Sequence, residues 1–421
     1  MASLKVSGTI RVPGDKSISH RALILASLAD GESTIRGILD SEDVNSTAGV
    51  LRALGAAVPA VSGSFAVKGG GLRGLRQPRS GLQCGNSGTT TRLMAGVVAA
   101  HPIAAQFIGD DSLSRRPMKR VAEPLGYMGA RFDFARGDGL PMTVHGTDLR
   151  SIDWDTKASS AQVKSAILLA GLVAGVEVRV TEKSPSRDHT ERMLRSAGVD
   201  IENDRNQVCL RPTARLAPLD INVPADPSSA AFFVALAALA NDGELLLTDV
   251  CLNPTRTGFL DVMQRMGCRI EVVDRTESGG ETIASLKIRP SELRGSVVGG
   301  ADIGSIIDEL PLLACVAAGA GVDLEIRGAE ELRVKESDRI ATVVHNLRAV
   351  GAEVDELPDG LRVHASRRPL AGTIDPRSDH RIAMAFGILS AASGNQIRVL
   401  NPECVAVSYP QFWEDLRAVT A

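Results

Sequence analysis

Apolar segments of helical length alternate with short β-branched segments along the chain, and this alternation recurs six times. Each repeat begins with small polar residues, continues as an Ala- and Leu-rich run and, after a turn, enters a β-branched segment. The six repeats begin at residues 15, 86, 159, 227, 303 and 377. The first four lie about 70 residues apart, too far for a solenoid, whose repeats usually span about 20–50 residues. The pattern therefore predicts six small α/β units.

A second pattern lies between these segments: an amphipathic helix that ends in glycine and is followed by a strand. Glycine just after the last helical residue is typical of a left-handed C-cap. The glycines that we expect in this role are Gly55, Gly129, Gly198, Gly267 and Gly351.

The two ends of the chain indicate how the repeats are divided into domains. The last repeat ends in a helix, 410–419, with no strand after it, whereas the chain opens with a strand, 5–12, that has no helix before it. We expect the opening strand to complete the sixth unit. One domain then consists of residues 1–13 and 225–421, and the other, residues 14–224, is an insertion. We predict an α/β fold of two similar domains with three units each, whose helix N-termini converge on the interdomain cleft.

Composition narrows the class of protein. Of 421 residues, 44% are hydrophobic and 23% are charged, as in soluble globular proteins, and this length favours two domains. Aromatic residues make up 3% and the net charge is −3, so we expect no nucleic-acid partner. The N-terminus has no apolar signal core, and the longest apolar run, 230–240, is too short for a membrane span. We expect a cytoplasmic protein without a membrane partner.

The six cysteines form no C-x-x-C pair, which favours buried reduced thiols over a disulfide or metal role. They are Cys84, Cys209, Cys251, Cys268, Cys315 and Cys404.

The first helix start, 14–21, has the features of an anion site. Ser17 is a natural N-cap, and its spacing from Arg21 places both on one helical face beside Lys16. Cationic side chains and free amides at a helix N-terminus together attract anions. A surface helix start with ordinary charges is the alternative for this stretch alone, but the stretch recurs.

Four more cationic clusters follow, at 114–120, 186–192, 335–339 and 379–381. Each alone is typical of a solvated surface. However, Lys335 and Arg339 are four residues apart on one expected helical face, where like charges repel unless an anion lies between them. Several such clusters favour a site for small, multiply anionic ligands held by arginine forks.

Two acids are candidates for proton transfer. Asp308 is expected at the start of an apolar helix, where it is either an N-cap or, if cations surround it, a general base. Glu336 is either an ion-pair partner of a neighbouring cation or a second acid/base group. A Walker A loop, an H-E-x-x-H motif and a dinucleotide fingerprint are all missing from the sequence.

Seven motifs in this order resemble those of the 5-enolpyruvylshikimate-3-phosphate synthase family, over nearly the whole chain. They are GDKSISHRA, GNSGTTTRLMAG, SRRPMKR, ASSAQVKSAILLAGL, SRDHTERML, ELRVKESDRI and SDHRIAMAF. The resemblance implies six βαβαββ units in two domains and no cofactor. It also implies a reaction, transfer of the enolpyruvyl group of phosphoenolpyruvate to the 5-hydroxyl of shikimate 3-phosphate with release of phosphate. We expect a monomer that uses these two small-molecule substrates.

The family's site residues map onto matching positions of this chain. For shikimate 3-phosphate the resemblance implies Lys16, Ser17, Arg21, Ser160, Ala161, Gln162, Arg187, Asp308 and Lys335. For phosphoenolpyruvate it implies Lys16, Asn86, Gly88, Arg116, Gln162, Arg339 and Arg381. The catalytic residues implied are Asp308 as the proton acceptor, Glu336 as a second acid/base group, and Lys16.

Three positions depart from the pattern of many family members. Val407 stands where they have a lysine, Glu331 where they have asparagine, and Leu93 where they have proline. The last two, with the S-A-Q and S-R-D-H-T motifs, are typical of the family's second subgroup. In this family glyphosate competes with phosphoenolpyruvate and lies against the glycine matched by Gly88. That glycine favours sensitivity to the inhibitor, whereas Leu93 favours tolerance.

Three other functions compete with this interpretation. UDP-N-acetylglucosamine enolpyruvyl transferase shares the fold and the donor but usually has a reactive cysteine in the loop matched by 109–117, which contains none here. A non-catalytic anion-binding protein explains the cations but not the acids Asp308 and Glu336. A kinase-like phosphotransferase requires a metal-phosphate motif that the sequence lacks.

Overall fold

The computed structural model describes residues 3–157, 159–392 and 394–420. The chain divides into two compact units. We call residues 1–13, 225–276 and 282–421 the terminal unit, and residues 14–224 with 277–281 the inserted unit. The short segment 277–281 thus packs with the inserted unit, although its neighbours on both sides in the chain belong to the other.

The inserted unit contains three sheets, each with one parallel strand pair. Their orders are β12–β2–β3 (Asp220–Asn222, Glu32–Arg36, Ser64–Lys68), β4–β5–β7–β6 (Leu82–Gln83, Ala104–Ile108, Met142–His145, Arg131–Phe134) and β10–β11–β9–β8 (Ile201–Asp204, Gln207–Leu210, Val178–Thr181, Ile152–Asp155). In the second sheet α3 connects the parallel strands β4 and β5, and in the third α6 connects β8 and β9, whereas the parallel strands β12 and β2 of the first sheet come from opposite ends of the insertion. The remaining strands pair antiparallel.

The helices of the inserted unit form its core. The three central helices are α1 (Lys16–Leu28), α3 (Gly88–Ala99) and α6 (Ala161–Ala174), and nearly all of their residues beyond the first turn are buried. The others are α2 (Glu42–Ala53), α4 (Asp111–Ser114), α5 (Lys119–Met128) and α7 (His189–Ser196). At Gly96 of α3 a Cβ atom would lie 2.1 Å from the carbonyl oxygen of Ala166, so the close α3–α6 packing requires glycine there.

The terminal unit has the same organisation. Its sheets are β1–β13–β15–β14 (Gly8–Ile10, Leu245–Cys251, Glu281–Arg289, Arg269–Ser278), β16–β17–β19–β18 (Ser296–Val298, Leu324–Ile326, Gly360–Val363, Val354–Leu357) and β20–β21 (Ala371–Ile374, Gln396–Val399). Its helices are α8 (Pro227–Leu239), α9 (Gly258–Arg265), α10 (Ile303–Ile306), α11 (Leu310–Ala320), α12 (Arg339–Ala349), α13 (His380–Ala391) and α14 (Phe412–Val419), with 3₁₀ turns η1 (Gly300–Asp302), η2 (Glu330–Val334) and η3 (Pro402–Val407).

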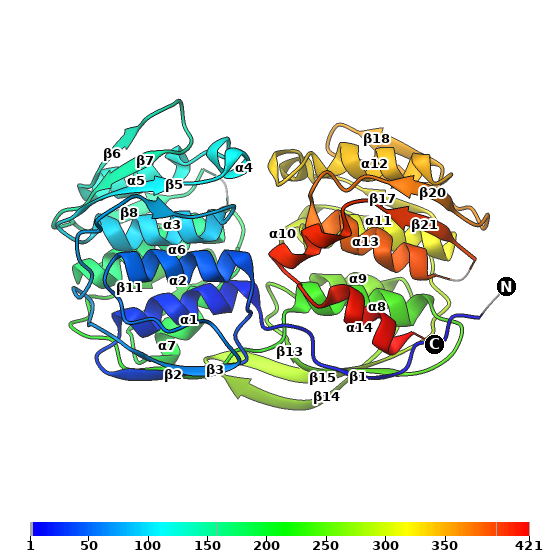
Figure 1. Ribbon diagram of the computed structural model, residues 1–421, viewed down its shortest axis with the longest axis horizontal. Helices are drawn as coiled ribbons and strands as arrows, with labels where there is room; N and C mark the ends of the chain where they lie inside the picture. The colour runs from blue at the N-terminus through cyan, green and yellow to red at the C-terminus, as the bar shows by residue number, and fades with distance from the viewer. Residues whose placement is uncertain (1–2, 158, 393, 421) are drawn as a thin grey trace. The chain divides into compact units, whose positions relative to one another are not determined.

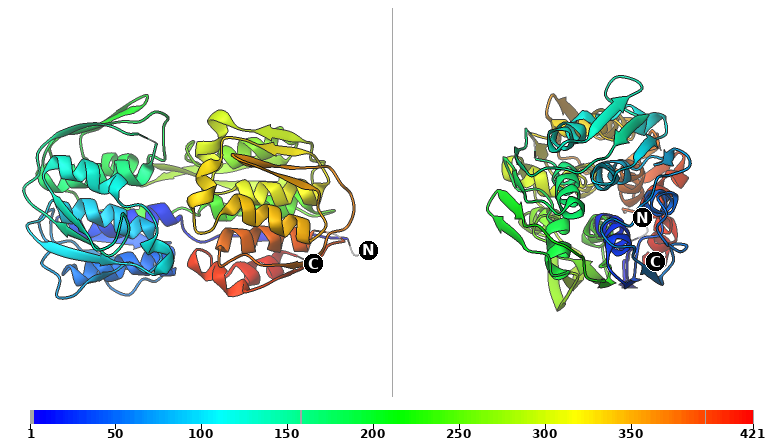
Figure 2. Two further views of the ribbon diagram at one scale, coloured as in Figure 1. Left: turned by 90° about the horizontal axis from the view of Figure 1, so that it is seen from above. Right: turned by 90° about the vertical axis from the view of Figure 1, so that its left-hand side faces the viewer.

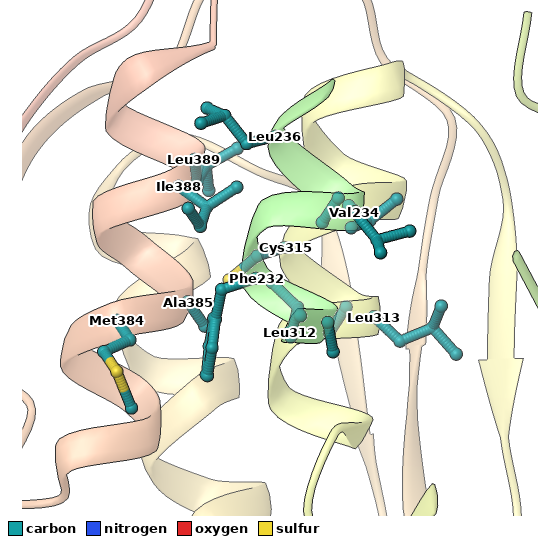
Figure 3. Packing of buried hydrophobic residues seen from close by; sticks show 14 of the residues in the cluster. Phe232, Val234, Leu236, Leu312, Leu313, Cys315, Met384, Ala385, Ile388 and Leu389 are labelled. Carbon is teal, nitrogen blue, oxygen red and sulfur yellow. The ribbon is translucent and has the colours of Figure 1, made fainter. Parts of the chain in front are cut away.

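In this unit α8, α11 and α13 pack on one another around a single apolar core. Figure 3 shows how side chains from the three helices meet there, among them Phe232, Leu312 and Ile388. Figures 1 and 2 show that the core helices of each unit lie inside, with the sheets around them.

The repeats confirm the predicted α/β fold but vary in completeness. Among the described residues, four repeats contribute a four-stranded sheet, whereas the sheet that follows α1 has three strands and the one that follows α13 has two. The five C-cap glycines all adopt positive φ angles, between 79° and 123°, which confirms the second sequence pattern.

The expectation that the opening strand completes the sixth unit is wrong. Strand β1 pairs in parallel with β13 of the fourth repeat, with Gly8 opposite Leu245, and only an isolated bridge joins Val6 to Thr420. The reason is topological, because each core helix needs a parallel strand before it. For helix α8 this strand is β1, from the start of the chain, which pairs with β13 after the helix. For helix α1 it is β12, from the far end of the insertion, which pairs with β2 after the helix.

Five of the six cysteines are buried and Cys404 is half-buried, and all six are free thiols as predicted. Burial raises the pKa of Cys84, Cys268 and Cys404 to about 11. In the described part of the chain, no single helix has the length and apolarity to cross a membrane. The segments 300–306 and 310–320 reach that length only as a pair bent by 106°.

Candidate active site

Helix α1 begins at Lys16, and its N-cap is Asp15 rather than Ser17. The Asp15 carboxylate accepts a hydrogen bond of 2.8 Å from the amide of Ile18. Our expectation that Ser17 is the N-cap is therefore wrong by two residues, because an aspartate upstream reaches the same free amides. The Lys16 ammonium donates to the Asp43 carboxylate at 3.0 Å. Ser17 and Lys16 remain half-buried at the helix start.

Arg21 lies one turn further on and is almost fully buried. Its guanidinium donates to the Thr190 hydroxyl at 2.6 Å, to the Ser165 hydroxyl at 2.7 Å and to the backbone carbonyl of Ser17 at 2.9 Å. Burial lowers the pKa of Arg21 to about 10, although the nearby carboxylate of Glu191 opposes this shift. Arg21 stays a cation at neutral pH and connects α1 to α6 and α7.

The start of α3 places a glycine between polar groups. Ser87 caps the helix by accepting from the amide of Thr90 at 3.2 Å, and Gly88 is its first residue. The preceding Asn86 accepts from the Arg116 guanidinium at 2.8 Å and donates to Asp110 at 2.6 Å. The structure therefore brings Asn86, Gly88 and Arg116 together.

Arg92 joins this group from the next turn of α3. Its Nη1 donates to the Gln162 side-chain oxygen at 2.6 Å, and the Gln162 amide nitrogen donates to the Thr89 hydroxyl at 2.9 Å. A Cβ atom on Gly88 would lie 2.8 Å from Arg92 Nη1 and 3.6 Å from Arg116 Nη1. Two guanidinium groups thus converge at the glycine. Gln162 belongs to the first turn of α6, after Ser160 at its N-cap and Ala161 as its first residue.

The S-R-D-H-T-E-R motif spans the end of a loop and the first turn of α7. Arg187 is half-buried in that loop and lies close enough to Arg21 for their charges to interact. His189 Nδ1 is 2.7 Å from the carboxylate of Glu281, a residue of the 277–281 segment, and both side chains are fully buried. The motif therefore contributes one predicted site residue and several structural contacts.

In the terminal unit, Arg339 lies at the centre of an acidic cluster. Its Nε donates to Asp379 at 2.8 Å, its Nη1 to Asp308 at 3.2 Å and its Nη2 to Glu336 at 2.6 Å. Its side chain is only 1% exposed. Burial by itself would lower the pKa of Arg339, but the charges of these three carboxylates outweigh it and raise the pKa above its ordinary value.

Arg381 approaches the same acids from α13. Its guanidinium donates to the backbone carbonyl of Asp308 at 3.3 Å and lies 3.7 Å from both the Asp308 and Glu309 carboxylates. Asp379 caps α13 by accepting from the amide of Arg381 at 3.0 Å. Asp308 precedes α11 in a turn and does not cap it, since Glu309 occupies the N-cap position. Asp308 therefore lies between two arginines.

Lys335 and Arg339 do not share a helical face, which corrects the expectation from their spacing. Lys335 follows η2 in an extended conformation, and α12 begins only at Arg339, after Asp338 accepts from the amide of Ala341. Lys335 instead pairs with Glu331 at 3.1 Å. Their charges are thus balanced by different carboxylates, and a bound anion is not required to keep them together.

Comparisons with known proteins agree along nearly the whole chain. A family model described as EPSP synthase (3-phosphoshikimate 1-carboxyvinyltransferase) matches residues 2–416. The chain belongs to the EPSP synthase family. A 3-phosphoshikimate 1-carboxyvinyltransferase of Sulfurihydrogenibium sp. (strain YO3AOP1) is 46% identical over 99% of this chain and 98% of its own. One from Persephonella marina is also 46% identical, over 99% and 97%.

A solved structure supports the same assignment of fold. The EPSP synthase of Acinetobacter baumannii matches with a TM-score of 0.90 and 38% identity, covering 99% of this chain and 96% of that one. The likeness therefore extends to the complete fold of a family member.

The structure gathers the predicted EPSP synthase site residues into two sets. The inserted unit carries Lys16, Ser17, Arg21, Asn86, Gly88, Arg116, Ser160, Ala161, Gln162 and Arg187, and the terminal unit carries Asp308, Lys335, Glu336, Arg339 and Arg381. Within the described residues, no group of three or more His, Cys, Asp or Glu side chains has the arrangement of a metal site.

Sequence reasoning missed three residues that hold these side chains in place: Asp43, Arg92 and Asp379. Asp379 is preceded by a serine and followed by the last repeat helix, a pattern that signals an N-cap and could have identified it. Arg92 and Asp43 leave no such local signal, because their partners Gln162 and Lys16 are distant in the sequence.

Proposed function

We propose that the residues described above carry out enolpyruvyl transfer, the reaction of the EPSP synthase family. The enzyme transfers the enolpyruvyl group of phosphoenolpyruvate to the 5-hydroxyl of shikimate 3-phosphate and releases phosphate, a step of aromatic amino-acid biosynthesis. Two anionic substrates must come together in this reaction, so cations are needed to cancel their repulsion. One group has to remove the hydroxyl proton while another protonates the methylene carbon of phosphoenolpyruvate.

The observation that carries the proposal is the cluster around Arg339. Asp308 lies between Arg339 and Arg381, and Glu336 pairs with Arg339 at 2.6 Å. Two carboxylates beside two arginines supply proton acceptors together with binding groups for a carboxylate or a phosphate. Asp308 is proposed as the base for the 5-hydroxyl, and Glu336 as the second acid/base group.

The remaining roles follow the family's motifs. Lys16, Ser17, Arg21, Ser160, Ala161, Gln162, Arg187 and Lys335 bind shikimate 3-phosphate in this proposal. Lys16, Asn86, Gly88, Arg116, Gln162, Arg339 and Arg381 bind phosphoenolpyruvate. The free amides at the starts of α3 and α6 favour anions in the same way, because the positive ends of helix dipoles lie there. We further propose a cytoplasmic monomer that works without a cofactor and without a nucleic-acid partner.

Phosphate release that requires both substrates tests the activity. The purified protein should release phosphate only when phosphoenolpyruvate and shikimate 3-phosphate are present together. Release from phosphoenolpyruvate alone, or none with both substrates, would contradict the proposed reaction.

The Asp308→Ala variant tests the role of the base. It should retain both substrates but lose turnover by ~10²–10⁴-fold, the usual contribution of a positioned base. Asp302→Ala is a suitable control, since Asp302 pairs with Arg265 near the surface of the same unit. Near-normal turnover in Asp308→Ala would remove Asp308 from the mechanism.

A further inference from the structure

A buried lysine in the inserted unit lies between two buried glutamates. The Lys164 ammonium, on α6, is 2.7 Å from the Glu182 carboxylate and 2.8 Å from the Glu191 carboxylate. None of the three side chains is more than 3% exposed. Removing three charges from water carries a large desolvation cost, and such pairs are often replaceable by apolar residues without loss of stability. Stability alone is therefore a weak explanation for this triad.

One end of the triad holds the loop that carries Arg187. The Ser186 hydroxyl donates to one Glu182 oxygen at 2.6 Å, and the Ser186 amide donates to the other at 3.2 Å. Lys164 also donates to the Ser186 carbonyl, at 3.4 Å. Three bonds thus fix the backbone immediately before Arg187, in a loop without regular secondary structure.

The two helices that Lys164 and Glu191 join, α6 and α7, also hold Arg21. Lys164 and Ser165 are neighbours on α6, and Thr190 and Glu191 are neighbours on α7. The Ser165 and Thr190 hydroxyls are 2.7 Å apart, and the Arg21 guanidinium donates to both. The ion pair of Lys164 with Glu191 lies beside this hydroxyl pair and joins the same two helices.

The charges in this region interact with one another. Lys164 lies between the carboxylates of Glu182 and Glu191, and the charge of Glu191 also acts on Arg21. Neutralising any member leaves an unpaired charge in a buried position, which forces the neighbouring side chains to rearrange. A change at Lys164 should thus displace both the Arg21 side chain and the Ser186 backbone.

We infer that Lys164, Glu182 and Glu191 are positioning residues that fix Arg21 and Arg187 for the phosphorylated sugar-acid substrate. The inference rests on the proposed function, in which these two arginines bind shikimate 3-phosphate and not phosphoenolpyruvate. The triad therefore governs the affinity for one substrate of the pair. It does not take part in the proton transfers.

Steady-state kinetics with each substrate varied in turn tests the inference. Lys164→Met, whose side chain is one atom shorter and carries no charge, should raise the KM for shikimate 3-phosphate at least tenfold. The KM for phosphoenolpyruvate and kcat should stay within about twofold of the parent. Among the described residues, the side chains proposed to bind phosphoenolpyruvate and to transfer protons form no bond with Lys164, Glu182 or Glu191.

A milder variant keeps the inference testable if Lys164→Met does not fold. Ser186→Ala removes only the bond to Glu182 and should raise the KM for shikimate 3-phosphate about three- to tenfold, the effect of one ordinary hydrogen bond. The matched control is Ser184→Ala, since Ser184 is exposed in the same loop and should leave both KM values unchanged. Thermal unfolding of each variant separates positioning from loss of fold.

The outcomes distinguish failure of the positioning role from failure of the proposed function. A selective rise in the KM for shikimate 3-phosphate supports the positioning role. An equal rise for both substrates, no rise in Ser186→Ala, or a loss of activity that merely follows the melting temperature overturns it. If the unmodified protein fails to release phosphate from both substrates together, the proposed function fails and the positioning role fails with it.

Discussion

Replacing Gly88 by alanine is a sharp test of the site because the structure shows what the added methyl group meets. The new Cβ would lie 2.8 Å from Arg92 Nη1, closer than real Cβ contacts come. Arg92 cannot retreat freely, because the same nitrogen donates to Gln162 at 2.6 Å. The methyl group therefore displaces the Arg92 guanidinium and should weaken the contact that orients Gln162, a residue proposed to bind both substrates.

The expected magnitude follows from that contact. A hydrogen bond to a charged group contributes about 1.5–3 kcal/mol. Its complete loss would raise the KM for phosphoenolpyruvate about ten- to hundredfold, and partial loss correspondingly less. Glyphosate inhibition should be competitive with phosphoenolpyruvate in the parent enzyme. Its inhibition constant should rise more than this KM in Gly88→Ala, because in the family the inhibitor lies directly against the matching glycine.

A double-mutant cycle with Arg92→Ala separates the two effects. Without the guanidinium, Gly88→Ala should add little to the KM for phosphoenolpyruvate but should still raise the inhibition constant. Gly49→Ala is the matched control, since nothing lies within 4 Å of a Cβ there and Gly49 is inside helix α2. Additive KM effects would refute transmission through Arg92. If millimolar glyphosate does not inhibit the parent enzyme, Leu93, which favours tolerance, was a better indicator of the response to the inhibitor than Gly88.

Three other predictions concern one buried arginine, one buried histidine and the half-buried Cys404. Arg339→Met should destabilise the protein by about 3–5 kcal/mol in urea unfolding, because three carboxylates lose their cation; a loss below about 1 kcal/mol would contradict this. Burial lowers the pKa of His20 from 6.5 to about 3, so below pH 6.5 the unfolded chain binds a proton that the folded chain does not. The contribution of His20 to the free energy of unfolding should therefore be complete above pH 6.5 and fall by about 1.4 kcal/mol per pH unit toward pH 3. The free energy of unfolding should accordingly fall less steeply with pH in His20→Gln than in the parent, whereas the exposed control His345→Gln should follow the parent. Cys404, half-buried, should be the first thiol alkylated by iodoacetamide at pH 8, and mass spectrometry showing prior labelling of a buried cysteine would refute this.

What the sequence could predict of this structure is mostly local. Helix starts, glycine C-caps and the alternation of helices with strands depend on neighbouring residues, and they agree with the structure. The α1 cap shows the limit, because Asp15 and Ser17 both carry capping oxygens and only the backbone geometry decides between them. The prediction that Lys335 and Arg339 share a helical face was wrong for a similar reason, since Asp338 caps a new helix that begins after Lys335.

The pattern of hydrophobic and polar residues could not predict contacts between residues that are far apart in the sequence. Arg339 pairs with Asp379 forty residues away, and Lys164 on α6 pairs with Glu182 in the loop after β9 and with Glu191 on α7. Each residue alone resembles a surface charge. Only the folded chain shows that these charges are buried and balanced, which is why motif matching found Arg339 without its buried partner.

The exchange of strands at the two links has a consequence for the order in which the chain folds. The amide of Asp15 donates to the carbonyl of Pro224 at 2.7 Å, and the amide of Asp226 donates to that of Pro13 at 2.9 Å. A ribosome releases β1 first, yet its partner β13 emerges only after the entire insertion. Once the insertion folds, its ends lie next to each other and hold the N-terminal strand where β13 will appear. The folded insertion then removes most of the loop-closure entropy of pairing strands so far apart in the sequence. Folding of residues 14–224 during synthesis would thus prepare the assembly of the rest of the chain.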